Sequence, residues 1–248
     1  MSMQEWHQHV ARWRECQKCP LGHQRKHICL GRGVTPADVI FVGEAPGQSE
    51  DDLGLPFKGP AGQLLDKIIA RALPADCRYA LTNLVACFPR YAKMEGINEP
   101  ERDEIAACRP RLVEFVRLCR PRLIVCVGAL ARRNIFGAAM FRLDDEAAQP
   151  EWIPDGKYLE FTDIIHPAAI LKSDMPLAKK NGAANHAAVV VRNAYERAMH
   201  GDSANLVNFT NEEHNAGVTS TPGTASSIRQ DAFEWWGRHG QPEDDIPF

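Results

Sequence analysis

The chain has 248 residues, of which 44% are apolar and 25% charged, a composition that excludes fibrous, intrinsically disordered and membrane-spanning proteins. No stretch approaches the roughly 20 consecutive apolar residues that a membrane span needs, and the first residues lack the pattern of a signal peptide. We therefore expect a cytoplasmic protein without a membrane partner, whose eight cysteines stay reduced.

The net charge of −3 is unevenly distributed. Residues 201–248 hold eight acidic and two basic residues, net −6, which leaves +3 on residues 1–200. A mildly basic body with an acidic tail is known among nucleic-acid-binding proteins, but +3 over 200 residues is weak support for that class.

Segments typical of helices and of strands alternate along the first 200 residues. Helices are predicted near 4–15 and at 61–73, 99–119, 128–136 and 183–199, and strands at 38–43, 79–85, 122–127 and 158–163. The first three strands are almost continuous apolar runs, as in parallel sheets covered on both faces. The alternation predicts an α/β fold, a three-layer α/β/α sandwich around a mainly parallel four-stranded sheet.

The character of the sequence changes after His200. Residues 201–240 contain many small and polar residues without periodicity, which is typical of a flexible linker. We expect a folded domain over residues 1–200, a disordered linker over 201–240 and an acidic tip over 241–248.

Polar residues follow the predicted strands where each strand ends. The first strand runs into Gly43-Glu44-Ala45-Pro46-Gly47, the second ends near Asn83, and the fourth is followed by His166. Ligands bind beyond the carboxyl ends of the strands in open α/β sheets, so we expect these side chains on one rim. Residues 43–47 also fit an ordinary turn before a helix, and the Walker pattern of phosphate loops is absent.

Phe57 lies in a loop of small residues and prolines, Leu55-Pro-Phe-Lys-Gly-Pro-Ala-Gly62. Such a ring can be exposed in a cleft and stack on a base. Core packing is the commoner role of an isolated Phe.

The cysteines divide into two sets. Cys16 and Cys19, in a CxxC pair, could join Cys87 and Cys108 in a four-thiolate site. Zinc and an iron–sulfur cluster are both compatible with such ligands, and four unrelated thiols remain the alternative. Four further cysteines have apolar or loop surroundings and are expected to be small buried residues: Cys29, Cys77, Cys119 and Cys126.

Together these motifs resemble the uracil-DNA glycosylase superfamily, most closely its iron–sulfur class, family 4. The resemblance covers about residues 14–199. In chain order it runs through Cys16–Leu21, Val42–Gly47, Leu55–Gly62, Thr82–Cys87, Glu104–Pro110, Arg120–Gly128 and His166-Pro167.

The resemblance implies a DNA-repair hydrolase that removes uracil from DNA and leaves an abasic site, after flipping the base into a pocket. Glu44, His166 and Asn83 would be catalytic: Glu44 orients water or stabilises the sugar cation, His166 donates to uracil O2, and Asn83 reads the uracil edge. The substrate-binding residues would be Gly43, Ala45, Pro46, Gly47, Phe57 and Asn83, with Phe57 stacking on the base.

The resemblance also implies DNA contacts and a cofactor. Pro167 and Ala168 would contact DNA, and Ala169, Ile170 and Leu171 would form a wedge that fills the vacated stack, with core packing as an equal alternative. A structural [4Fe–4S] cluster would be held by the four cysteines Cys16, Cys19, Cys87 and Cys108.

The sequence departs from the family pattern in three places, the first being the usually basic, proline-rich run after the third cysteine, which here is Phe88-Pro89-Arg90. Ala168 stands where the family has Ser after His-Pro, and the segment between Cys87 and Cys108 is long. It contains no His, unlike the related class that traps DNA covalently. The alternative is a non-catalytic protein with this fold that binds DNA or replication and repair factors.

The final residues, Glu243-Asp-Asp-Ile-Pro-Phe248, resemble the acidic tip of bacterial single-stranded-DNA-binding proteins. A basic-rimmed apolar pocket on a genome-maintenance protein could capture such a tip. The docking residues would be Asp244, Asp245, Ile246, Pro247 and Phe248. A solubilising acidic tail is the alternative.

Overall fold

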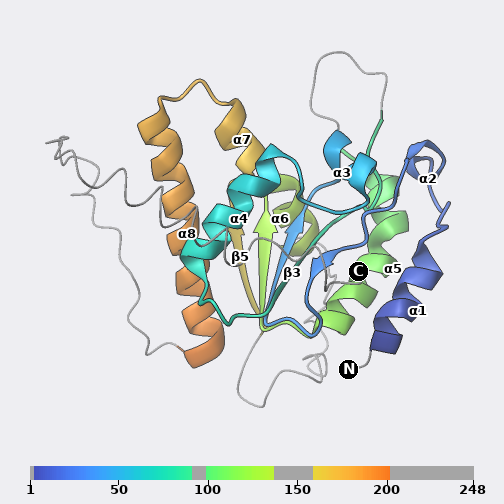
Figure 1. Cartoon of the computed structure of the whole chain (residues 1–248), viewed down its shortest axis with the longest axis horizontal. Helices are drawn as coiled ribbons and strands as arrows, with labels where there is room; N and C mark the ends of the chain where they lie inside the picture. Colours follow the sequence, from blue (N-terminus) through green and yellow to red (C-terminus); the bar gives the residue numbers. More distant parts are fainter. Residues whose placement is uncertain (1–2, 91–98, 137–158, 202–248) are drawn as a thin grey trace, which may run out of the picture. The chain divides into compact units, whose positions relative to one another are not determined.

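The computed structural model describes residues 3–90, 99–136 and 159–201 (Figure 1). Helices and strands alternate through these residues in an order close to the predicted one. The elements are α1 (Met3–Trp13), α2 (Leu21–Gln24), β1 (Arg32–Gly33), β2 (Val39–Gly43), α3 (Gln48–Leu53), α4 (Pro60–Ala72), β3 (Tyr79–Asn83), α5 (Arg102–Cys119), β4 (Leu123–Val127), α6 (Ala129–Phe136), β5 (Glu160–Ile164), α7 (Pro167–Lys172) and α8 (Leu177–His200).

The strands form one sheet in the order β1-β3-β2-β4-β5. β2 pairs in parallel with both β3 and β4, and β4 pairs in parallel with β5. The α/β fold class and the four predicted parallel strands are confirmed, but the predicted strand count is wrong because β1 adds a fifth, antiparallel strand at the edge. β1 has only two residues, too few to give an alternating or continuous apolar pattern.

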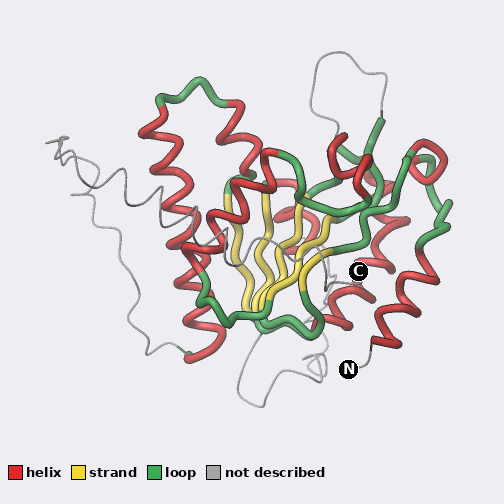
Figure 2. The backbone as a smooth tube through the Cα atoms, in the orientation of Figure 1, coloured by secondary structure: helices red, strands yellow, loops and turns green. Residues whose placement is uncertain are grey.

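Helices cover both faces of the sheet, as the apolar runs of the strands require (Figure 2). Side chains of β2 alternate between the two sides: Ile40 and Val42 belong to the core beneath α1, α5 and α6, whereas Val39 and Phe41 belong to the core beneath α4 and α8. The three-layer arrangement is therefore confirmed.

The helix α8 packs against the sheet through a stripe of small side chains, which allows close approach of the helix backbone. The buried members of this stripe are Ala184, Ala187, Ala188, Val191, Ala194 and Ala198. Among the helices of the described residues, none combines the length and the apolar composition that crossing a bilayer requires.

The boundaries of several predicted elements shift. The second predicted strand ends at Asn83 rather than at residue 85, and α8 begins at Leu177 rather than at 183. Three helices of four to six residues were not predicted, α2, α3 and α7, because one turn or little more shows no clear periodicity. Beyond Gly201, the predicted linker and tip lie outside the described residues.

Candidate active site

The carboxyl ends of the four parallel strands meet at one edge of the sheet, close to α3, α4 and α7 (Figure 1). Glu44 directly follows β2, and Asn83 is the last residue of β3, where it pairs in register with Gly43. Gly128 directly follows β4, and His166 comes two residues after β5. The predicted residues therefore start from neighbouring strand ends.

Asn83 and Phe57 meet over Gly43. A Cβ atom at Gly43 would lie 2.4 Å from Asn83 Oδ1 and 2.5 Å from Phe57 Cζ, so only glycine leaves room for both side chains. Both are buried, with 2% of Asn83 and 6% of Phe57 exposed. The Asn83 amide thus adjoins the Phe57 ring, which packs in the core beneath α4 and α8 and is not exposed in a cleft as the sequence allowed.

Glu44 and His166 meet over Gly128 in the same way. A Cβ atom at Gly128 would lie 2.5 Å from Glu44 Oε1 and 3.1 Å from His166 Cδ2. Gly128 also has a φ of +99°, a left-handed conformation that L side chains rarely adopt. The chain turns here from β4 into α6, and this turn brings a carboxylate and an imidazole to one place.

Glu44 is half-buried, and its Oε1 accepts a hydrogen bond of 3.2 Å from the backbone N–H of Leu130 in the first turn of α6. Burial raises the pKa of Glu44 above its ordinary 4.5, while the Leu130 N–H opposes this by favouring the carboxylate. A carboxylate held this way is oriented and still able to accept a further proton or hydrogen bond.

His166 caps the N-terminus of α7, where its Nδ1 accepts a hydrogen bond of 3.1 Å from the Ala168 N–H. Burial lowers the pKa of His166 below its ordinary 6.5, and the charge of Lys172 acts in the same direction. A neutral imidazole that accepts at Nδ1 carries its proton on Nε2. The cap therefore leaves His166 as an Nε2–H donor.

The conformation of Phe57 is held by contacts to its backbone. Its φ is +56°, which is uncommon for an aromatic residue, and its carbonyl accepts a 3.2 Å bond from Arg32 Nη2. Arg32 also donates to the Pro56 carbonyl at 2.9 Å and pairs with Asp66 at 2.6 Å. A Cβ atom at Gly62 would lie 1.9 Å from the Phe57 carbonyl oxygen, so the loop packs tightly on α4.

Glu50 of α3 joins the two loops that carry Glu44 and Phe57. Its Oε2 accepts from the Gly47 N–H at 3.1 Å, and its Oε1 accepts from the Gly59 N–H at 2.7 Å. The residue is buried, with 8% of its surface exposed. One carboxylate thus satisfies a backbone donor in each loop and fixes their separation.

The remaining residues predicted to bind substrate or DNA take different places. Pro46 is buried, while Ala45 and Gly47 are half-buried beside the turn after β2. Residues 167–171 lie on α7, where Pro167 and Ile170 are buried and Ala168 is half-buried. Ala169 and Leu171 are exposed, so of the proposed wedge trio these two reach the surface, and Ile170 packs in the interior.

The four predicted cysteine ligands come from three separate segments and border the same apolar core. Cys16 and Cys19 lie between α1 and α2, Cys87 follows β3, and Cys108 lies on α5. Arg25 links two of these segments, because its Nη1 donates to the Cys16 carbonyl at 2.6 Å and contacts Cys87 Sγ at 3.7 Å.

The surroundings of these thiols combine burial with hydrogen-bond donors. Burial raises the pKa of Cys87 to about 12, and the charge of Arg25 opposes this rise. Burial also raises the pKa of Cys19, while hydrogen bonds from the Leu21 and Gly22 backbone N–H groups lower it. The nearby Cys108 raises the pKa of both Cys19 and Cys87. Burial outweighs these donors, so without a bound metal both groups favour the neutral thiol.

Within residues 3–90, 99–136 and 159–201, no group of three or more His, Cys, Asp or Glu side chains could hold a single metal ion. An iron–sulfur cluster distributes four thiolates over several irons and therefore needs a wider arrangement than one ion does. Cys16, Cys19, Cys87 and Cys108 are free thiols, the type of ligand that such a cluster binds.

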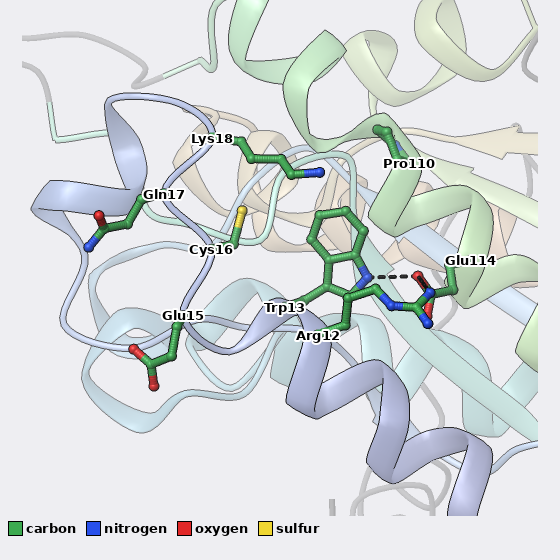
Figure 3. Close-up of a pocket in the computed structure, with 8 residues that line it drawn as sticks. All are labelled: Arg12, Trp13, Glu15, Cys16, Gln17, Lys18, Pro110 and Glu114. Atoms are coloured by element: carbon green, nitrogen blue, oxygen red, sulfur yellow. Dashed lines mark hydrogen bonds and ion pairs between the residues drawn. The ribbon is translucent and has the colours of Figure 1, made fainter.

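A surface pocket lies beside the cysteine segments rather than at the strand ends (Figure 3). Trp13 is one of the residues that line it and donates from Nε1 to Glu114 of α5 at 2.8 Å, and Lys18 Nζ lies 4.7 Å from the centre of the indole ring. The pocket also includes Cys16, but none of the residues gathered over Gly43 and Gly128 lines it.

Sequence reasoning missed the residues that hold the site in place. Arg32, Glu50 and Arg111 have polar side chains that look like ordinary surface residues in the sequence, yet they bond to the backbone of the site loops. The one available signal was the Gly47-x-x-Glu50 spacing, in which the Glu reaches back to the N–H at the start of a helix.

Residues 30–188 match the family described as the Uracil DNA glycosylase superfamily. The chain belongs to the uracil-DNA glycosylase superfamily. It is 33% identical over 176 residues to the type-4 uracil-DNA glycosylase of Pyrobaculum aerophilum, an alignment that covers 69% of this chain and 86% of the relative.

Two further relatives are also type-4 uracil-DNA glycosylases. The protein of Saccharolobus solfataricus is 40% identical over 124 residues, which cover 50% of this chain and 55% of the relative. That of Archaeoglobus fulgidus is 34% identical over 164 residues, which cover 63% of this chain and 78% of the relative. The resemblance to family 4 of the superfamily is therefore confirmed.

Proposed function

We propose that the protein hydrolyses the N-glycosidic bond of uracil in DNA and leaves an abasic site. The observation that carries the proposal is that Asn83 and Phe57 meet over Gly43 while Glu44 and His166 meet over Gly128, on neighbouring strand ends. Membership of the superfamily and similarity to type-4 enzymes support the same activity.

Base recognition is assigned to Asn83 and Phe57. The Asn83 carbonyl accepts from uracil N3–H and its amide donates to O4, whereas cytosine presents the opposite pattern. A site built for one pattern leaves buried groups unpaired with the other, which can discriminate by about 10⁴-fold or more. Stacking on Phe57 contributes about 1–3 kcal/mol to the binding free energy of any base.

The bond-breaking step is assigned to His166 and Glu44. As the C–N bond breaks, negative charge develops on the uracil oxygens and positive charge on the sugar. The Nε2–H of a neutral His166 donates to O2, and the Glu44 carboxylate orients the attacking water or stabilises the sugar cation. Both roles match the protonation states that the Ala168 and Leu130 backbone contacts favour.

We also propose that Cys16, Cys19, Cys87 and Cys108 hold a [4Fe–4S] cluster. Hydrolysis needs no electron transfer, so the cluster would serve to join the segments that carry these cysteines. Arg25 supports this assignment over four unrelated thiols, because it links the segment of Cys16 to Cys87 by contacts to the Cys16 carbonyl and to Cys87 Sγ.

A strand-cleavage assay tests the activity. The protein is incubated with an oligonucleotide that contains one uracil, and alkali then cuts the strand at any abasic site. We expect cleavage at the uracil by the wild type and by Asp52→Asn, which changes an exposed carboxylate. Cleavage should fall strongly in Glu44→Gln. Absence of abasic product from the wild type at several salt concentrations would overturn the proposal.

We further propose that the acidic segment Glu243–Phe248, which lies outside the described residues, docks genome-maintenance proteins. Its acidic run, Ile and Phe support this, because basic-rimmed apolar pockets capture such segments. Deletion of Ile246–Phe248 should abolish binding to a protein that recognises single-stranded-DNA-binding-protein tips and leave uracil excision unchanged. Unchanged binding after the deletion would overturn this part.

A further inference from the structure

Arg111 on α5 is the largest fully buried side chain of the described residues, with 1% of its surface exposed. Its guanidinium donates to three groups at the end of β3: Thr82 Oγ1 at 2.7 Å, the Asn83 carbonyl at 2.5 Å and the Leu84 carbonyl at 3.0 Å. A longer bond of 3.4 Å reaches the Leu30 carbonyl. Arg111 therefore holds the backbone of Asn83 and Leu84 and the side chain of Thr82.

A buried guanidinium is costly unless its donors are satisfied, and in Arg111 both Nη1 and Nη2 are bonded whereas Nε has no partner among the described residues. In the described part of the chain, the hydrogen bonds of Arg111 go to neutral oxygens and not to a carboxylate. β1 pairs with β3 at Ala80 and Leu81, and among residues 3–90, 99–136 and 159–201 no strand pairs with that edge of β3 beyond Leu81. Arg111 therefore supplies hydrogen-bond donors to the Asn83 and Leu84 carbonyls in place of a neighbouring strand.

Arg111 also lies between the base-reading residue and the cysteines. It follows Cys108 by three residues, about one helical turn on α5, and Cys87 follows Asn83 by four residues. The hydrogen bonds of Arg111 thus join the segment that carries Cys87 to the helix that carries Cys108. A shift of α5 relative to the end of β3 would move Asn83.

We propose that Arg111 is a positioning residue that fixes the Asn83 amide for uracil recognition and couples it to the cysteine-bearing helix. The inference rests on the proposed function and deepens it. Arg111 touches neither base nor sugar in this account; it acts on the substrate through Asn83. The site would therefore lose uracil affinity when Arg111 loses its donors, even where the fold remains intact.

The test compares Arg111→Met, which removes the donors, and Arg111→Lys, which keeps the charge but not the fork of donors. Leu112→Ala is the matched control, because Leu112 is equally buried on α5 and its change creates a cavity without removing a hydrogen bond. Each variant is measured for thermal stability, for single-turnover excision, for inhibition by free uracil and for binding to abasic-site DNA.

We expect Arg111→Met to weaken inhibition by free uracil and to slow excision by about tenfold or more, the size expected when a charged hydrogen-bond donor is lost. Binding to abasic DNA should stay within about twofold, since that product lacks the base that Asn83 reads. Arg111→Lys should lose less uracil affinity and less excision rate than Arg111→Met. Leu112→Ala should have a lower thermal stability but the uracil affinity of the wild type.

A double-mutant cycle with Asn83→Ala decides whether Arg111 acts through Asn83. Residues that act as a unit give non-additive losses, so adding Arg111→Met to Asn83→Ala should cost little more. The inference would be overturned if the fold-losses of the two single variants multiplied in the double variant, or if Arg111→Met were inhibited by uracil as strongly as the wild type. If Arg111→Met does not fold, Arg111→Lys takes its place in the cycle. A wild type without excision would instead overturn the proposed function.

Discussion

Glu44 and His166 approach a single point from the two strands on either side of β4, since Glu44 Oε1 and His166 Cδ2 lie 2.5 and 3.1 Å from the position of a Cβ atom on Gly128. β4 lies between β2, which Glu44 follows, and β5, which His166 follows. Gly128, directly after β4, has no side chain and thus leaves room for both groups.

Gly128→Ala should reduce excision strongly. The new methyl group would displace the Glu44 carboxylate, and the φ of +99° would add strain of about 1–3 kcal/mol. We expect single-turnover excision to fall by about 10- to 100-fold, because a small misplacement of a catalytic group can have that effect. Gly182→Ala is the control: a Cβ atom there meets nothing within 4 Å, and activity should be unchanged. Equal activity of both variants would contradict the assigned geometry.

Glu50→Ala should loosen both loops of the site. It leaves the Gly47 and Gly59 N–H groups without their acceptor, a loss of about 1–3 kcal/mol in unfolding free energy for each group left buried. We expect a lower melting temperature together with slower excision, and a smaller effect from Glu50→Gln, which keeps one acceptor. Asp52→Asn on the same helix should change little. Wild-type excision by Glu50→Ala would show that the two loops keep their places without this residue.

Arg32→Met should affect substrate affinity through Phe57. It removes the donors to the Pro56 and Phe57 carbonyls and leaves the left-handed conformation of Phe57 without support. We expect KM for uracil-containing DNA to rise by about tenfold, the value of a lost stacking interaction of about 1–2 kcal/mol. The control is Arg78→Met, which breaks an exposed ion pair with Asp38. If both variants keep the wild-type KM, the stacking role of Phe57 is contradicted.

Excision should be lost at acid pH as Glu44 becomes protonated. Burial raises its pKa above 4.5, and the carboxylate is the active form, so the rate should rise with pH through that pKa and then level off. The same shift means that the folded state favours protonated Glu44, so its charge costs stability above the pKa. Glu44→Gln should therefore raise the melting temperature at neutral pH and lose this advantage as the pH falls. A lower melting temperature at neutral pH would contradict the direction of the shift.

The cysteines give a spectroscopic prediction. The purified wild type should contain about four irons and absorb near 400 nm, as expected of a [4Fe–4S] protein. Cys87→Ser and Cys108→Ser should lose iron and absorbance, whereas Cys77→Ser should keep both, because Cys77 lies away from the other segments beside Asp38 and Tyr195. A colourless preparation that contains zinc would overturn the cluster assignment.

Three of the four parallel strands were predictable because they are buried on both faces and so give apolar runs, as Val39–Val42 does, whereas the partly exposed β5 is more polar. The residues at the strand ends were predictable for a related reason: parallel strands place their carboxyl ends on one edge, so Glu44, Asn83 and His166 had to start close together. The edge strand β1 was not predictable, because two residues are too few to show a periodic pattern of apolar side chains.

The supporting residues were not predictable, because their role depends on contacts between distant segments. Arg111 lies among alternating charged and apolar residues of a helix, a pattern that normally marks a solvated face, yet its side chain is buried against β3. Ile170 could not be assigned from the sequence either, because an apolar residue after His-Pro fits both a DNA wedge and core packing. The structure places its side chain in the interior.

The most direct test of the central claim is to quantify free uracil and abasic sites from one reaction on a single-uracil oligonucleotide. Hydrolysis at the site formed by Glu44, Phe57, Asn83 and His166 predicts equal amounts of the two products, and neither product from the matched oligonucleotides with cytosine or thymine. Broken strands without released uracil, or intact substrate with no free base, would contradict the account.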